Sequence, residues 1–67
     1  MYNIRNKEGY LTAMVSPMIM RRMVRMYVGE WSEVKGVQRY TFKERAAFGD
    51  GEISVVIFAG SYIDMEQ

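Results

Sequence analysis

Apolar and polar residues largely alternate over positions 2–15 of the chain, which is the period of a β-strand. The tetrapeptide 6–9, with asparagine first and glycine last, interrupts the alternation and has the composition of a turn. A four-residue loop pairs Ile4 with Leu11 and Tyr2 with Ala13. The pattern therefore predicts a hairpin over 2–15. Its apolar face consists of Tyr2, Ile4, Leu11, Ala13 and Val15.

The period changes after Ser16 and Pro17, a pair that suits the start of a helix. Serine accepts a hydrogen bond from a free amide of the first turn, and proline has no amide to leave unpaired. At about 100° per residue, the apolar side chains fill one arc and three arginines lie opposite. The apolar arc contains Ile19, Met20, Met23, Val24, Met26 and Tyr27, and we expect its methionines in the core.

The end of this helix has two interpretations. Gly29 can stop a helix by taking the left-handed conformation. Continuing the wheel, however, places Trp31 and Val34 within the apolar arc and Gly29 on the outer side. We therefore expect the helix to span 17–35 and to stop at Gly36. A glycine inside a helix lowers the stability of that helix by about 1 kcal/mol relative to alanine.

The third periodic segment, 37–59, predicts a second hairpin, because Asp50-Gly51 is a strong signal for a tight two-residue turn. Such a turn pairs Phe48 with Ile53 and Phe42 with Ala59. The inner face then carries Tyr40, Phe42, Ala46, Phe48, Ile53, Val55, Ile57 and Ala59, with Glu44 as the only polar exception. The outer face carries Arg39, Thr41, Lys43 and Arg45 beside Ser54, Val56 and Phe58.

These elements predict a single α+β domain over 1–67. The order β-β-α-β-β favours a small two-layer arrangement, with one helix packed on one face of an antiparallel sheet. A small curled β-barrel with one helix is the alternative. The tail 60–67 is apolar but short, and an edge strand is one role open to it. No repeat or low-complexity linker divides the chain.

The amino-acid composition limits which catalytic and metal-binding chemistry the chain can perform. The chain lacks cysteine and histidine, which removes disulfides, thiol nucleophiles, the commonest metal ligand and the usual catalytic base. The serines therefore have no partner for nucleophilic catalysis. Asp50 and Glu52 are the closest carboxylate pair, and they flank a turn glycine, which explains them without catalysis. We expect no enzymatic activity, no cofactor and no metal.

The absence of cysteine fits a reducing compartment, and no segment approaches the roughly 20 apolar residues that a membrane span requires. We expect a cytoplasmic protein without a membrane partner. The net charge is only +1, but all nine lysines and arginines fall within 1–45, and 46–67 carries only acidic residues. Any basic surface must therefore come from the first two thirds of the chain.

Two surfaces are candidates for partner binding. The first is the outer strand face with Arg39, Lys43, Arg45, Val56 and Phe58, where the predicted register places Phe58 opposite Lys43 and Val56 opposite Arg45. Cations around an exposed aromatic ring suit an acidic protein partner or a nucleic acid. Burial of Val56 and Phe58 by the chain itself is the structural alternative. The second candidate is the helix ridge of Arg21, Arg22 and Arg25.

The leading functional hypothesis is a non-catalytic binding module, of a regulatory, accessory or phage-type kind, that docks on a larger protein and modulates or inhibits it. Single-stranded nucleic-acid binding through the basic and aromatic sheet face is one alternative. A homodimer, formed through Val56 and Phe58 or through the tail, is another. We also expect Tyr10, Met14 and Met18 to be exposed. No feature of the sequence identifies the partner.

Overall fold

The computed structural model describes residues 1–66, which form one helix and seven strands. The α+β class expected from the sequence is confirmed, whereas the chain has more strands than the predicted β-β-α-β-β order. The elements are β1 (Tyr2–Arg5), β2 (Leu11–Val15), α1 (Pro17–Met26), β3 (Gly29–Val34), β4 (Val37–Phe42), β5 (Ala46–Gly49), β6 (Ser54–Ile57) and β7 (Tyr62–Asp64).

Five strands form an antiparallel sheet in the order β2-β1-β7-β4-β3, and β5 and β6 form a separate two-stranded sheet. The strands described by the structure do not close into a barrel. The predicted edge role of the tail is wrong, because β7 lies between β1 and β4. Its Ile63 side chain is fully buried. A strand in the middle of a sheet has its backbone covered by a strand on each side, and its apolar side chain can be buried in the core.

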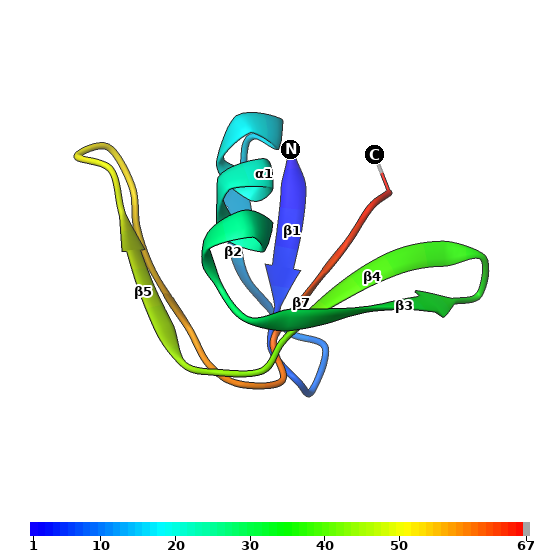
Figure 1. The fold of residues 1–67 in the computed structure, drawn as a ribbon. Coiled ribbons are helices and arrows are strands. Elements are labelled where there is room, and N and C mark those ends of the chain that lie inside the picture. Colours follow the sequence, from blue (N-terminus) through cyan, green and yellow to red (C-terminus); the bar gives the residue numbers. More distant parts are fainter. Residues whose placement is uncertain (67) are drawn as a thin grey trace.

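The two sheets are halves of one long ribbon that bends. β4 leads through residues 43–45 into β5, and β6 leads through 58–61 into β7. Figure 1 shows the ribbon turning below the helix, so that its β5–β6 half rises beside α1. At the corner, the Phe42 amide donates to the Ser61 carbonyl and the Gly60 amide donates to the Phe42 carbonyl, both at 2.8 Å. Gly60 has a φ of +92°, a conformation that glycine adopts readily.

The predicted hairpin over 37–59 is therefore correct in its faces, except at the exposed Ala59, and wrong in its register. Phe48 pairs with Val55 rather than Ile53, and Phe42 meets the returning chain at Gly60 and Ser61 rather than at Ala59. The loop has four residues, because the Asp50 carboxylate accepts the amides of Glu52 and Ile53, each at 3.0 Å. A slip of two residues keeps every side chain on the same face.

The first hairpin shows a similar correction. Its turn lies where the sequence predicts, since the Asn6 side chain accepts the amides of Glu8 and Tyr10. The register differs: Tyr2 pairs with Val15 and Ile4 with Ala13, with an irregularity after Ile4. Leu11, which was expected on the apolar face, is consequently half exposed.

The helix starts as predicted and ends early. The Ser16 hydroxyl accepts the Ile19 amide at 3.2 Å, which is the expected cap. The helix stops at Met26, and neither Gly29 nor Gly36 ends it, so the prediction of a helix to Lys35 is wrong. Met20 and Met23 are buried, as expected, but Met26 is exposed.

Residues 29–34 form a strand because all six of them pair with residues of β4. Trp31 pairs with Tyr40, and their rings meet edge to face with centroids 5.0 Å apart. Lys35 and Gly36 both have positive φ, at 52° and 82°, and they join Val34 to Val37 as a two-residue hairpin turn. Trp31 and Val34 are three residues apart, which fits a helical period and not an alternating one. Cross-strand packing on β4 overrides this local signal.

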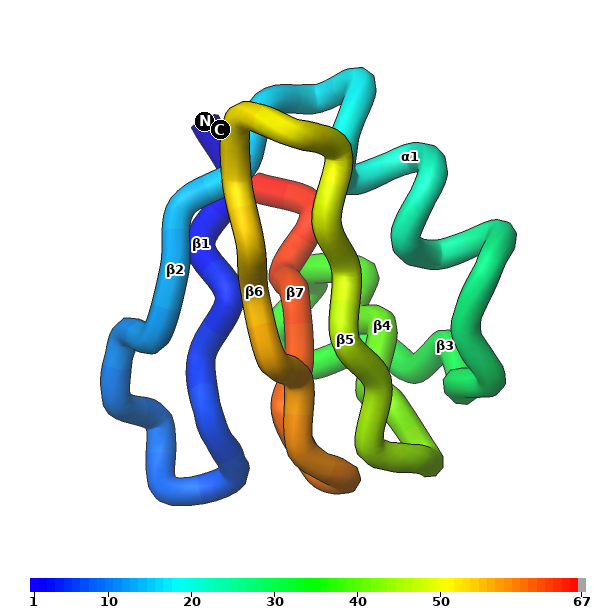
Figure 2. The backbone as a smooth tube through the Cα atoms, turned by 90° about the vertical axis from the view of Figure 1, so that its left-hand side faces the viewer, coloured from blue at the N-terminus to red at the C-terminus, as the bar shows by residue number. Residues whose placement is uncertain are grey.

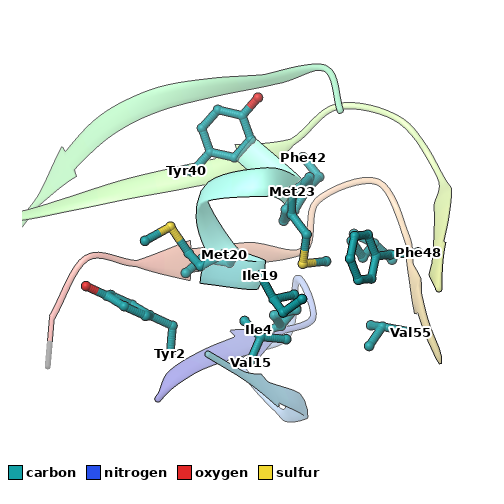
Figure 3. Packing of buried hydrophobic residues seen from close by; sticks show 12 residues of the cluster. Tyr2, Ile4, Val15, Ile19, Met20, Met23, Tyr40, Phe42, Phe48 and Val55 are labelled. Carbon is teal, nitrogen blue, oxygen red and sulfur yellow. The ribbon is translucent and has the colours of Figure 1, made fainter. Parts of the chain in front are cut away.

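One face of the five-stranded sheet is covered by α1 and by the β5–β6 ribbon (Figure 2). The core that they enclose draws a side chain from the helix and from six strands (Figure 3). Its members are Tyr2, Ile4, Val15, Ile19, Met20, Met23, Tyr40, Phe42, Phe48, Val55, Ile57 and Ile63. No element of residues 1–66 forms a layer over the opposite face of the sheet.

The strand at 29–34 is tested by Gly29→Ala. A Cβ at Gly29 would overlap the buried Tyr40 ring, so we expect the free energy of unfolding to fall by about 1–3 kcal/mol. A helix here would instead gain about 1 kcal/mol from the same change. Urea unfolding measures the sign. Ser32→Ala, at an exposed position of the same strand, is the control and should change stability by less than about 0.5 kcal/mol.

Candidate binding surfaces

The Arg39 side chain lies on the uncovered face of the sheet, where it is hydrogen-bonded to Asp64. Its Nε donates to Asp64 Oδ1 at 2.7 Å and its Nη2 donates to Asp64 Oδ2 at 3.2 Å. The guanidinium also lies 3.9 Å from the centroid of the Tyr62 ring. Hydrogen bonding to Asp64 raises the pKa of Arg39, which stays cationic. This side chain joins β4 to β7 and is not a free cation.

Lys43 lies in the bend, where its Nζ is 3.2 Å from Glu30 Oε2 of β3. The predicted neighbours of the outer strand face are therefore wrong. Val56 pairs with Ala47 rather than lying opposite Arg45, and Phe58 follows the end of β6 rather than facing Lys43 on a paired strand. The bend separates the three cations that a straight hairpin would align.

Arg45, Val56 and Phe58 remain together on the β5–β6 half of the ribbon. The Arg45 guanidinium lies 5.5 Å from the centroid of the Phe58 ring. Phe58 is 59% exposed and Val56 is 45% exposed. The described chain therefore does not cover these two side chains, neither with the tail nor with the first hairpin.

A depression of about 500 Å³ lies beside the Phe58 ring. We call it the Phe58 groove. It lies between the turn of the first hairpin and the returning end of the ribbon, and its walls are Asn6, Lys7, Glu8, Arg45, Phe58, Ala59 and Ser61. Sequence reasoning missed the turn residues, because only the corner at Phe42 and Gly60 brings them next to Phe58. Gly60, which directly follows the predicted strand, was the available signal.

The arginine ridge is exposed on the helix, as expected, but its members differ in their surroundings. The Arg22 guanidinium lies 5.3 Å from the centroid of the buried Phe48 ring. The amides of Ile53 and Glu52 lower the pKa of Asp50, and the charge of Arg22 adds to that effect. Arg22 thus ties the helix to the ribbon. Arg21 and Arg25 form no ion pair with any residue that the structure describes.

Exposed apolar side chains are numerous for a chain of 67 residues. Tyr10, Met14 and Met18 are exposed, as the sequence predicts. Met14 and Met18 line a second depression of about 290 Å³, which reaches the tip of the ribbon at Asp50, Glu52 and Ile53. A third, of about 260 Å³, lies on the uncovered sheet face beside Tyr62 and Asp64.

Neither shifted pKa belongs to a group suited to proton transfer at neutral pH. The pKa of Asp50 is lowered in a turn, and that of Arg39 is raised by Asp64. Among residues 1–66, no group of three or more acidic side chains could hold a metal ion. Within the same range, no helix is long and apolar enough to cross a membrane.

The chain matches no family model, and neither the curated proteins nor the solved structures contain a significant match to it. The case for a function therefore rests on the surfaces described above.

The hydrogen-bonded turn at Asp50 predicts how the stability of the fold changes at low pH. Hydrogen bonds from the amides of Ile53 and Glu52 lower the pKa of Asp50. A lowered pKa in the folded state contributes stability that is present above the unfolded value of about 3.9 and is lost as pH falls through the folded value. Asp50→Asn keeps an acceptor oxygen but does not titrate. The loss of stability between pH 7 and about pH 3, measured by urea unfolding, should be smaller in this variant. Equal losses would contradict the assignment.

Proposed function

We propose that this chain is a non-catalytic module that docks on a larger protein through the Phe58 groove and modulates or blocks that protein. The observation that carries the proposal is the exposed Phe58 ring beside the Arg45 guanidinium, at the rim of a depression. Aromatic and arginine side chains dominate the energetic centres of protein interfaces. Val56 extends the apolar surface along β6.

The charges around the groove favour a protein partner over a nucleic acid. Single-stranded nucleic acids need a continuous row of cations along the phosphates. Here Arg39 and Lys43 are paired with carboxylates, and Arg45 and Lys7 are accompanied by Glu8. This mixed rim suits an apolar anchor flanked by an acidic group, which Arg45 can receive.

A second copy of the chain is a weaker candidate for the partner. The tail, one of the two routes considered for a homodimer, already serves as the central strand β7. Val56 and Phe58 remain accessible to a second copy. Sedimentation equilibrium of the isolated chain distinguishes this case, because a dimer would form without any other protein.

The docking surface is tested by Phe58→Ser in a quantitative capture experiment with extract from the source cells. Loss of a central aromatic anchor costs about 2 kcal/mol, so recovery of the true partner should fall about 30-fold. Met26→Ser is the matched control, because Met26 is 57% exposed, close to the 59% of Phe58, and lines none of the depressions described above. Mass spectrometry should show one protein that Phe58→Ser loses and Met26→Ser retains.

Two results would contradict the proposal. The first is a set of captured proteins that Phe58→Ser and wild type share in equal amounts. The second is saturable, salt-sensitive binding of short single-stranded DNA or RNA at micromolar protein, weakened by both Phe58→Ala and Lys43→Ala. Fluorescence anisotropy measures that affinity, and this outcome would favour nucleic-acid binding instead.

A further inference from the structure

The free edge of β6 lacks the features that normally prevent a strand edge from pairing. β6 pairs with β5 on one side, and no backbone hydrogen bond reaches it from another strand among the described residues. Its sequence, Ser54–Ile57, contains no charge and no proline, and three of its four residues are β-branched. Exposed strand edges usually carry lysine, proline or a covering group, because they are templates for another strand.

Two other edges of the fold, those of β3 and β5, show such protection. β3 carries Glu30 and Glu33 along its free edge. β5 is covered where the Tyr27 hydroxyl donates to the Ala47 carbonyl at 2.9 Å. β2 is uncharged like β6, and it borders the same side of the molecule through Met14 and Val15 (Figure 2). The unprotected edges are thus gathered on one side.

The two ends of β6 differ in charge. Before the strand, Asp50 and Glu52 line one depression together with a single cationic side chain, Arg22. After the strand, Lys7 and Arg45 line the Phe58 groove together with a single acidic side chain, Glu8. The seven residues from Glu52 to Phe58 would span about 20 Å in an extended conformation. A strand laid along this edge would therefore meet mainly acidic side chains at one end and mainly basic side chains at the other.

We propose that the free edge of β6 receives an extended segment of the docked protein, which adds antiparallel to β6 and is charged only at its two ends. Its acidic first residue lies toward Lys7 and Arg45, and its basic last residue lies toward Asp50 and Glu52. This inference rests on the proposed function and assigns the chemistry of the partner. Main-chain hydrogen bonds supply the attraction, and the two charged ends fix direction and register.

The probe is the capped heptapeptide Asp-Val-Thr-Val-Thr-Val-Arg, titrated into the isotopically labelled full chain and followed by NMR. The control peptide exchanges the two charged residues and has the same composition. We expect the first peptide to bind at least about fivefold more tightly, because the control meets like charges at both ends. Bound peptide should also slow hydrogen exchange at the amides of 54–57 that face the free edge.

Ser54→Lys is the matching change in the protein, because a lysine on an exposed strand blocks edge pairing. It should weaken the first peptide at least about fivefold, whereas Ser32→Lys, at an exposed position of β3, should leave the affinity unchanged. Equal affinity for both peptides, binding without slower exchange at 54–57, or no binding at millimolar peptide would each overturn strand addition.

Failure of strand addition would be distinct from failure of docking. If the captured partner still depends on Phe58 while the amides of 54–57 in that complex exchange at the rate of the free protein, the partner docks by side chains alone. The proposed function would then stand, and the β6 edge would have no part in it.

Discussion

The corner at Phe42 and Gly60 is the constraint on which the rest of the structure depends. Both backbone groups of Phe42 are bonded to the returning chain, at Ser61 and Gly60. Its side chain is fully buried and meets the Tyr27 and Tyr40 rings edge to face, with centroids 6.5 and 5.3 Å away. Burial of one phenylalanine contributes about 1.5–3 kcal/mol. In a chain of this size that is a substantial share of the net stability.

The corner also arranges the surface. By turning the ribbon up beside the helix, it places Phe48, Val55 and Ile57 in the core and leaves Val56 and Phe58 exposed on the other side of the ribbon. It sends Arg39 and Lys43 away from Arg45, toward Asp64 and Glu30. The exposed apolar and basic groups that support docking, and the unpaired edge of β6, are all consequences of this bend.

Much of this architecture follows from local sequence signals. The Ser16 cap, the turn at Asn6 and the inner and outer faces of the ribbon each depend on neighbouring residues, and each was predicted. The exposed positions of Arg21, Arg22 and Arg25 follow from the helical period, whereas the sequence left open whether Val56 and Phe58 are exposed. What the sequence could not supply is the effect of contacts between distant residues, which can override a local period.

The segment 29–34 illustrates how a distant contact can override a local sequence pattern. Its helical period is real, but Gly29 lies against Tyr40, and a strand that allows this close approach also pairs Trp31 with the same ring. The bend was likewise hidden, although Glu44 gave a sign of it. This one polar residue on the predicted apolar face falls in the bend and is exposed to solvent. A misfit in an otherwise clean alternation marked the point where the strand stops.

The most direct test of this account is a NOESY spectrum of the chain, which detects protons on directly opposed residues. The bent ribbon predicts cross-strand contacts between Phe48 and Val55 and between Thr41 and Tyr62. Contacts between Phe48 and Ile53 and between Phe42 and Ala59 would show a straight hairpin. That result would contradict the corner and, with it, the surfaces assigned to binding.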